Sequence, residues 1–292
     1  MRYSINHQTI YTYSQPVFLN PHSLRMRPRS DGRQNLLNFS LSITPSPKET
    51  AEIVDLNGNN VIQLWFTYPT EILTINIRSE VKTYNNNPFS YLLEPWAVNL
   101  PIDYPISLFN QLQPYLDFYN KIPDPAIVQL AQEILHKVQG NTLNFLSSLN
   151  QKIYENCHYT IRETGEAWQP GITWKNQQGS CRDNALLFME ACRVVGLGVR
   201  FVSGYQEGDR HQEQRDLHAW VEVYLPGGGW RGYDPTHGLA VAHGYMALAA
   251  SPFPQGAAPV TGEITPVRPI VETNQPPKSA IAVHLFIEHQ DE

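Results

Sequence analysis

Three side chains of this 292-residue chain have the types and positions that covalent acyl transfer requires. The first is Cys181, at the predicted start of a helix in the run 179–183 (Gly-Ser-Cys-Arg-Asp). The positive end of a helix dipole favours the thiolate form of a thiol, which is the nucleophilic form. Most free cysteines are small buried hydrophobic residues, however, so Cys181 indicates catalysis only if it has partners.

Two later residues are predicted to be those partners. His218 opens the strand-like run 218–225, and Asp234 closes a second short run, 230–234. The turn sequence Pro-Gly-Gly-Gly lies halfway between them, so a hairpin would bring both residues to the same open end. There the imidazole can act as base for the thiol and the carboxylate can hold it in one tautomer. Taken singly, a histidine bonded to a carbonyl and an Asp-Pro turn residue are the simpler interpretations.

Acyl transfer also needs hydrogen-bond donors for the oxyanion. The backbone N–H of Cys181, at a helix start, is one natural donor. The second is sought among Gln177, Gln178, Trp174 and the indole of Trp168, and Gln178 ranks first only because it is nearest in sequence.

Other polar and aromatic residues near these motifs have simpler roles. Trp220 is predicted to pack around the three residues, although Trp220 and Trp168 are also candidates for substrate binding. Asp183, three residues after Ser180, fits a capping box. Glu222 is expected to be solvated or paired rather than catalytic.

The first third of the chain has the period of β-strands. Polar and apolar residues alternate, and the turn sequence Asn-Gly-Asn-Asn at 57–60 indicates a hairpin. The pattern predicts an antiparallel β-sandwich whose strands include residues 3–13, 36–43, 61–66 and 73–81.

After an irregular stretch at 84–123, the apolar period changes to 3.6. Asp124-Pro125 predicts a helix start, and a second apolar stripe covers 143–157. The third helix begins near Ser180. Cys157 and Cys192 lie on apolar stripes and are predicted to be core residues.

Strands follow at 199–203, 218–225 and 230–233, then a proline-rich segment, 251–279, predicted to be an extended loop. Residues 281–287 are predicted to form a closing strand. The division is therefore an N-terminal β-sandwich domain at 1–100, a linker at 101–123 and a catalytic core at 124–292 that includes the proline-rich segment and the last strand.

Several of these motifs resemble those of the bacterial transglutaminase-like enzymes, also described as candidate cysteine proteases. The core resemblance covers roughly residues 140–250. The N-terminal part is similar to the β-rich domain found before that core. The motifs are Gly-Ser-Cys-Arg-Asp-Asn-Ala at 179–185, Leu-His-Ala-Trp-Val-Glu-Val-Tyr-Leu-Pro-Gly-Gly-Gly-Trp at 217–230, Tyr-Asp-Pro-Thr-His-Gly at 233–238, Leu-Arg-Met-Arg-Pro-Arg at 24–29 and Asp-Leu-Asn-Gly-Asn at 55–59.

The resemblance implies an α+β, papain-like core in which a helix bearing the cysteine packs on an antiparallel sheet bearing the histidine and the aspartate. It places the nucleophile, base and orienting acid on Cys181, His218 and Asp234. The expected substrate is a peptide or protein amide, and water or an amine resolves the acyl-enzyme. The alternatives are a small-molecule amidase or acyltransferase on the same core, and a catalytically silent binding or scaffold protein that keeps the fold.

Composition excludes other classes. The net charge of −6 argues against a nucleic-acid partner, and no run of 18 apolar residues predicts a membrane span. The N-terminus does not resemble a signal peptide, and three cysteines are too few for a disulfide framework, so we expect a cytoplasmic protein with free thiols. The chain has no Cys-x-x-Cys and no His-Glu-x-x-His, so neither a metal nor another cofactor is expected. The oligomeric state does not follow from the sequence.

Overall fold

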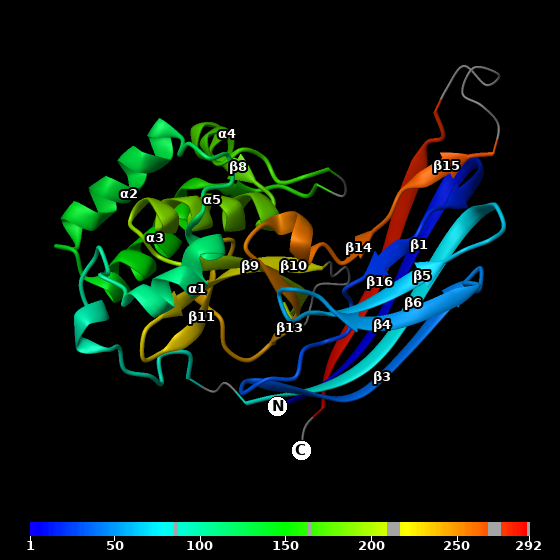
Figure 1. Cartoon of the computed structure of the whole chain (residues 1–292), viewed down its shortest axis with the longest axis horizontal. Coiled ribbons are helices and arrows are strands. Elements are labelled where there is room, and N and C mark those ends of the chain that lie inside the picture. Colours follow the sequence, from blue (N-terminus) through cyan, green and yellow to red (C-terminus); the bar gives the residue numbers. More distant parts are fainter. Residues whose placement is uncertain (85–86, 163–164, 209–216, 268–275, 291–292) are drawn as a thin grey trace.

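A computed structural model describes residues 1–84, 87–162, 165–208, 217–267 and 276–290. The chain forms two parts, a long β-rich part and a part in which helices cover a sheet (Figure 1). The start of β1 and the end of β16 lie at the same end of the β-rich part (Figure 1). No helix in the described ranges is long and apolar enough to cross a membrane.

The β-rich part is the predicted sandwich. One sheet has the order β15-β1-β6-β3, with β16 also paired to β1, and the other has the order β14-β2-β5-β4. Leu24, Ile62 and Leu64 of the second sheet share a buried cluster with Leu73 and Ile75 of the first. The strands are β1 (Arg2–Leu19), β2 (His22–Leu24), β3 (Gln34–Thr44), β4 (Glu49–Val54), β5 (Asn60–Trp65), β6 (Thr70–Thr83), β14 (Val260–Thr261), β15 (Ile264–Pro266) and β16 (Ser279–Gln290).

The last strands lie in the sandwich, whereas the sequence division assigned them to the catalytic core. β16 is the predicted closing strand, and it pairs antiparallel with β1 from Arg2↔Gln290 to Tyr13↔Ser279. Within the proline-rich segment, β14 pairs with β2 and β15 pairs with the end of β1. Strand alternation predicts that such a segment is a strand, but it does not predict which edge the strand joins.

The second part has the predicted papain-like arrangement of helices on an antiparallel sheet. The sheet has the order β12-β11-β10-β9-β13, with β9 (Val199–Gln206), β10 (His218–Leu225), β11 (Gly229–Asp234), β12 (Leu239–Ala240) and β13 (Tyr245–Ser251). The helices α2 (Pro125–Lys137), α3 (Thr142–Asn156), α4 (Pro170–Asn176) and α5 (Cys181–Val194) lie on this sheet or on one another (Figure 1). Phe188 of α5 shares the buried core with Val221 and Val223 of β10. Cys157 and Cys192 are buried in the same core, as predicted.

The stretch assigned to a linker contains a helix. α1 (Ile106–Leu116) lies within 101–123, after the short 3-10 helix η1 (Pro95–Ala97). It has no side-chain cap, it contains Pro114, and Leu112 is its one buried residue. Helices are predicted from sequence by an N-terminal capping residue and by a stripe of apolar residues, and both signals are weak here.

The sandwich is joined to the edge of the core sheet by two amide side chains. Gln34 donates to the carbonyl of Ala247 at 3.0 Å and accepts from its N–H at 2.7 Å. Asn59, at the predicted turn, makes the same two bonds with Ala250, at 2.9 and 2.8 Å. These amides hydrogen-bond to backbone N–H and C=O groups on the outer edge of β13, which would otherwise be unpaired. A shared apolar cluster lies beside this edge and contains Tyr3, Ile5, Val81, Leu285 and Ile287 of the sandwich and Tyr205, Met246 and Leu248 of the core.

Candidate active site

Cys181 is the first residue of α5, as predicted. Ser180 is the N-cap, and the reciprocal bonds of a capping box with Asp183 are both present. The Asp183 carboxylate accepts from the backbone N–H of Ser180 at 2.8 Å and from its hydroxyl at 2.7 Å. The thiol is half-buried, so it lies at the surface end of the helix and not inside the core.

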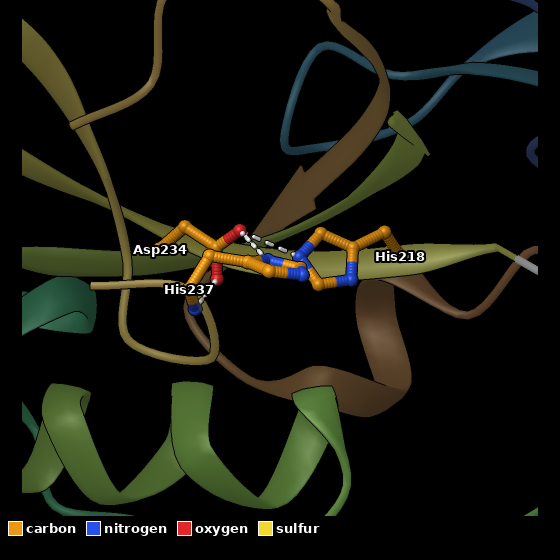
Figure 2. Close-up of side chains that lie close together, drawn as sticks. All are labelled: His218, Asp234 and His237. Carbon is orange, nitrogen blue, oxygen red and sulfur yellow. Dashed lines mark hydrogen bonds and ion pairs between the residues drawn. The ribbon is translucent and has the colours of Figure 1, made fainter. Parts of the chain in front are cut away.

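The structure brings the three predicted residues together. Nε2 of His218 lies 2.8 Å from Oδ2 of Asp234, and the Cys181 side chain is close enough to the same imidazole to raise its pKa. Figure 2 shows the His218 ring with one nitrogen directed at Asp234 and the other directed away from it. His218 is at the start of β10, and Asp234 ends β11; the two strands are paired as the predicted hairpin, from Val221↔Tyr233 to Leu225↔Gly229.

The electrostatics of this group favour a charged imidazole. Burial alone would lower the pKa of His218, which is 8% exposed. The charge and hydrogen bond of Asp234, together with those of Cys181, outweigh burial and raise the pKa to about 10. Burial would conversely raise the pKa of Asp234, but the charges and hydrogen bonds of His218 and His237 hold it well below its ordinary value.

Two further side-chain partners of Asp234 were not expected from the sequence. Its Oδ2 also faces Nδ1 of His237 at 2.8 Å and accepts from the hydroxyl of Tyr245 at 2.7 Å. Its Oδ1 accepts from the backbone N–H of Thr236 at 2.9 Å. His237, three residues after Asp234 and across a turn, was visible in the Asp-Pro-Thr-His motif. Tyr245 comes from β13, which no local signal connects to this site.

A second buried carboxylate fixes the segment before α5. Asp183 accepts two bonds from the Arg162 guanidinium at 2.7 Å each and one from the backbone N–H of Trp168 at 2.7 Å. Burial would raise the pKa of Asp183, but these bonds and those from Ser180 lower it. The Arg162 guanidinium lies 4.3 Å above the Trp168 ring. Asp183 is thus a helix cap, as predicted, and also an anchor for the residues that flank Cys181.

Trp220 packs beside the His218 ring. It is 1% exposed, and its ring is tilted 27° from the His218 ring with centroids 6.3 Å apart. Tyr245 packs on it edge-on at 5.4 Å. Burial of this kind supports the packing role and leaves no face of Trp220 for a substrate. Glu222 is paired, as expected, with Arg29 and Arg200.

The candidates for the oxyanion hole have different environments. Gln178 is exposed, and its amide donates to the Thr160 hydroxyl at 3.2 Å. Trp174 and Cys181 are both partly buried against the same apolar core. Gln177 is the left-handed residue that ends α4, with φ of 51°.

His218, Asp234 and His237 are also a set of side chains able to hold a metal ion, because their ligand atoms lie within 4.8 Å of one another. The two nitrogens are each 2.8 Å from a single carboxylate oxygen, which is a hydrogen-bond distance. Ligands around one tetrahedral zinc ion, at about 2.0–2.1 Å from it, are farther apart than this. The group as it stands is a hydrogen-bonded network.

Comparison with protein families agrees with this fold and these motifs. Residues 3–82 match the bacterial transglutaminase-like N-terminal region, and residues 128–235 match the transglutaminase-like superfamily. The chain therefore combines a bacterial transglutaminase-like N-terminal region with a transglutaminase-like core, which confirms the resemblance seen in the sequence.

One relative extends the sequence match over most of the chain. An uncharacterised protein of Mycobacterium bovis is 27% identical over 288 residues, which cover 94% of this chain and 88% of the relative. A protein-glutamine gamma-glutamyltransferase of Pseudomonas aeruginosa is 29% identical over 127 residues, or 40% of this chain and 19% of the relative. The solved structure of a candidate cysteine protease from Cytophaga hutchinsonii shares the fold, with a TM-score of 0.72 and 21% identity, and the match covers 100% of this chain and 92% of that one.

Proposed function

We propose that this protein is a thiol acyl-transfer enzyme that acts on amide bonds of peptides or proteins. Cys181 is the nucleophile, His218 the general base and acid, and Asp234 the acid that orients His218. The observation that carries the proposal is the hydrogen bond between the His218 ring and the buried Asp234 carboxylate, at a place where the Cys181 side chain helps to raise the pKa of the same imidazole.

The charge state of His218 supports this assignment. With its pKa raised to about 10, His218 is an imidazolium at neutral pH, next to the thiol. An imidazolium stabilises a thiolate, and the start of α5 adds the favourable end of the helix dipole. The proton that the amine will need is therefore already on His218.

The reaction proceeds through two substitutions at one carbonyl carbon. The thiolate of Cys181 attacks the amide carbonyl, a C–S bond forms, the C–N bond breaks, and His218 gives its proton to the departing amine. Water or a primary amine then attacks the thioester while His218 takes the proton of the attacking group. The C–S bond breaks and the thiolate returns. The backbone N–H of Cys181 is the first oxyanion donor, and Gln178, Trp174 and Trp168 are candidates for the second.

The group that attacks the thioester decides between hydrolysis and transamidation. Water gives a peptidase or amidase, and a lysine-type amine gives a protein-glutamine transamidase. The partial match to a protein-glutamine gamma-glutamyltransferase supports glutamine side chains as the first substrates to offer.

The test uses the full chain with a glutamine-containing peptide, with and without a primary diamine such as cadaverine. Mass spectrometry distinguishes the free acid, which indicates hydrolysis, from the amine conjugate, which indicates transamidation. We expect one of the two products from the wild type and neither from Cys181→Ala. Products that persist in Cys181→Ala would remove the proposal. A folded wild type that gives no product from a panel of peptide amides, and whose Cys181 resists alkylation, would support a silent scaffold instead.

A further inference from the structure

A cavity of about 440 Å³ lies where the sandwich part meets the core, away from Cys181. Residues from both parts form its walls, and two kinds of side chain predominate, arginines and aromatic rings. The lining residues that matter here are Arg33 and Tyr84 from the sandwich side and Arg200, Trp230 and Arg231 from the core sheet.

Positive charge exceeds negative charge at this cavity. Four arginines gather there, because Arg29 reaches Glu222 beside the three arginines of the wall. The carboxylates present are those of Glu222 and Asp31. The whole chain has a net charge of −6, so a local excess of positive charge runs against its overall composition.

Both carboxylates are already bonded to other groups. Glu222 accepts from Arg29 at 2.8 Å and from Arg200 at 2.7 Å. Asp31 accepts from the backbone N–H groups of Arg33 and Gln34 with Oδ1, and its Oδ2 lies 3.6 Å from Arg29. Neither carboxylate lies within ion-pair distance of the side chain of Arg33 or Arg231, although the charge of Arg33 helps to lower the pKa of Glu222.

Arg33 and Arg231 are held in place by neutral groups. Arg33 donates to the carbonyl of Trp230, while Arg231 donates to the carbonyl of Gly228 at 2.8 Å and lies 4.2 Å above the ring of Tyr91. Among the residues that the structure describes, neither guanidinium has a carboxylate within ion-pair distance. Burial lowers the pKa of Arg231, and the positive charge of Arg33 lowers it further. Two like charges are thus fixed beside one cavity, and each still has N–H donors to offer.

We propose that this cavity binds a dianionic oxyanion of the phosphate class, held between Arg33 and Arg231. Two guanidinium groups that have no carboxylate within ion-pair distance match the charge of a phosphate group, about −1.5 to −2 at neutral pH, and a single carboxylate would neutralise only one of them. Arg33 comes from the sandwich part and Arg231 from β11, so the bound anion joins the two parts of the chain.

This site is separate from the three-residue site. Glu222 follows His218 by four residues on β10, which corresponds to about 13 Å along a strand. Trp220 lies between them and is buried. Phosphate binding therefore does not depend on whether Cys181 performs acyl transfer.

Isothermal titration of the full chain with inorganic phosphate tests the proposal, at constant ionic strength set with sodium chloride. Arg33→Gln and Arg231→Gln are the test variants. Arg78→Gln is the matched control, because it removes the same charge from an exposed position on β6. We expect saturable binding, a phosphate-dependent rise in the thermal midpoint, at least a tenfold weaker affinity in each test variant and no change in Arg78→Gln. Acetate and sulfate test whether the site requires a doubly charged anion. We expect sulfate to compete with phosphate and acetate not to compete.

Two results would overturn the proposal. One is a phosphate effect no larger than that of sodium chloride at the same ionic strength. The other is wild-type affinity in both test variants, which would locate the binding elsewhere. If Arg33→Gln fails to fold because the bond to Trp230 is lost, the affinity of Arg231→Gln for phosphate decides the test alone. The Arg231 side chain lies at the cavity wall and bonds to a turn carbonyl, that of Gly228.

Discussion

Nδ1 of His237 lies 2.8 Å from Oδ2 of Asp234, the same oxygen that faces Nε2 of His218 at 2.8 Å (Figure 2). The Tyr245 hydroxyl donates to this oxygen as well. Asp234 is thus held by three side chains from three places in the sequence. Its orientation, and through it that of His218, depends on residues outside the three predicted ones.

Replacing His237 by alanine tests this dependence. His237 has a 43% exposed side chain, and its loss removes one bond to a charged acceptor. Such a bond contributes about 1.5–3 kcal/mol, so we expect kcat to fall roughly tenfold or more while KM stays close to wild type. His237→Asn, whose amide can still donate, should recover part of kcat. A loss as complete as that of Asp234→Asn would make His237 a rival base.

Asp234→Asn keeps the size of the side chain and removes its charge. The amide cannot stabilise the His218 imidazolium, so we expect turnover to fall by roughly a thousandfold or more. Peptide binding, measured by titration with the Cys181→Ala background to prevent turnover, should stay near wild type. An unchanged rate would reduce Asp234 to a turn residue.

Cysteine alkylation provides a test with internal controls. Burial raises the pKa of Cys157 to about 11 and raises the pKa of Cys192 well above its ordinary value. We expect iodoacetamide to label Cys181 fastest and to label it more slowly in His218→Ala; peptide mass spectrometry measures all three cysteines. Cys181→Ala should leave the thermal midpoint close to wild type while it abolishes turnover. Equal labelling of all three thiols in a folded protein would contradict the thiolate–imidazolium pair.

The raised pKa of His218 also determines how stability depends on pH. A group whose pKa is about 10 in the folded chain, against an ordinary 6.5, stabilises the fold fully below pH 6.5. That contribution is lost as the pH rises through the folded-state pKa. We therefore expect the difference in thermal midpoint between wild type and His218→Asn to be largest at acidic to neutral pH and to shrink toward about pH 10. His284→Asn, on the exposed side of β16, is the control. A difference that grows with pH would contradict the direction of the shift.

Two neighbouring residues of β16 test its place in the fold. Leu285 is 4% exposed and packs in the cluster between the sandwich and the core, whereas Phe286 is 60% exposed. Leu285→Ala should lower the free energy of unfolding by about 2–5 kcal/mol, and Phe286→Ala should change it by about 0.5 kcal/mol or less. Urea unfolding measures both. Equal effects would mean that β16 is not held in this register.

The sequence predicted the elements with strong local signals and the site residues that carry motifs. The capped helix at Cys181, the hairpin between His218 and Asp234 and the sandwich strands all have such signals. β13 was not predicted, because all seven of its residues are buried and Tyr-Met-Ala-Leu-Ala-Ala-Ser does not alternate. Tyr245, which this strand supplies to Asp234, was consequently missed as well.

Contacts between distant segments were also not predicted from the sequence. Arg162 pairs with Asp183 across 21 residues, and Gln34 pairs with Ala247 across 213. Neither pair has a local pattern, because each residue is unremarkable in its own segment and becomes important only through its partner.

The pairing of β1 with β16 has a consequence for how the chain is made. A ribosome releases β1 long before β16, so the edge of β1 that pairs with β16 stays open while the segments between them are synthesised. The strands of the core sheet, from β9 to β13, leave the ribosome earlier than β16. They can therefore pair with one another before β16 is available to pair with β1. An open edge is a template for wrong pairing. Arrest of translation before β16 would therefore yield a nascent chain whose core sheet is complete and whose strand β1 still has one unpaired edge that needs protection by a chaperone.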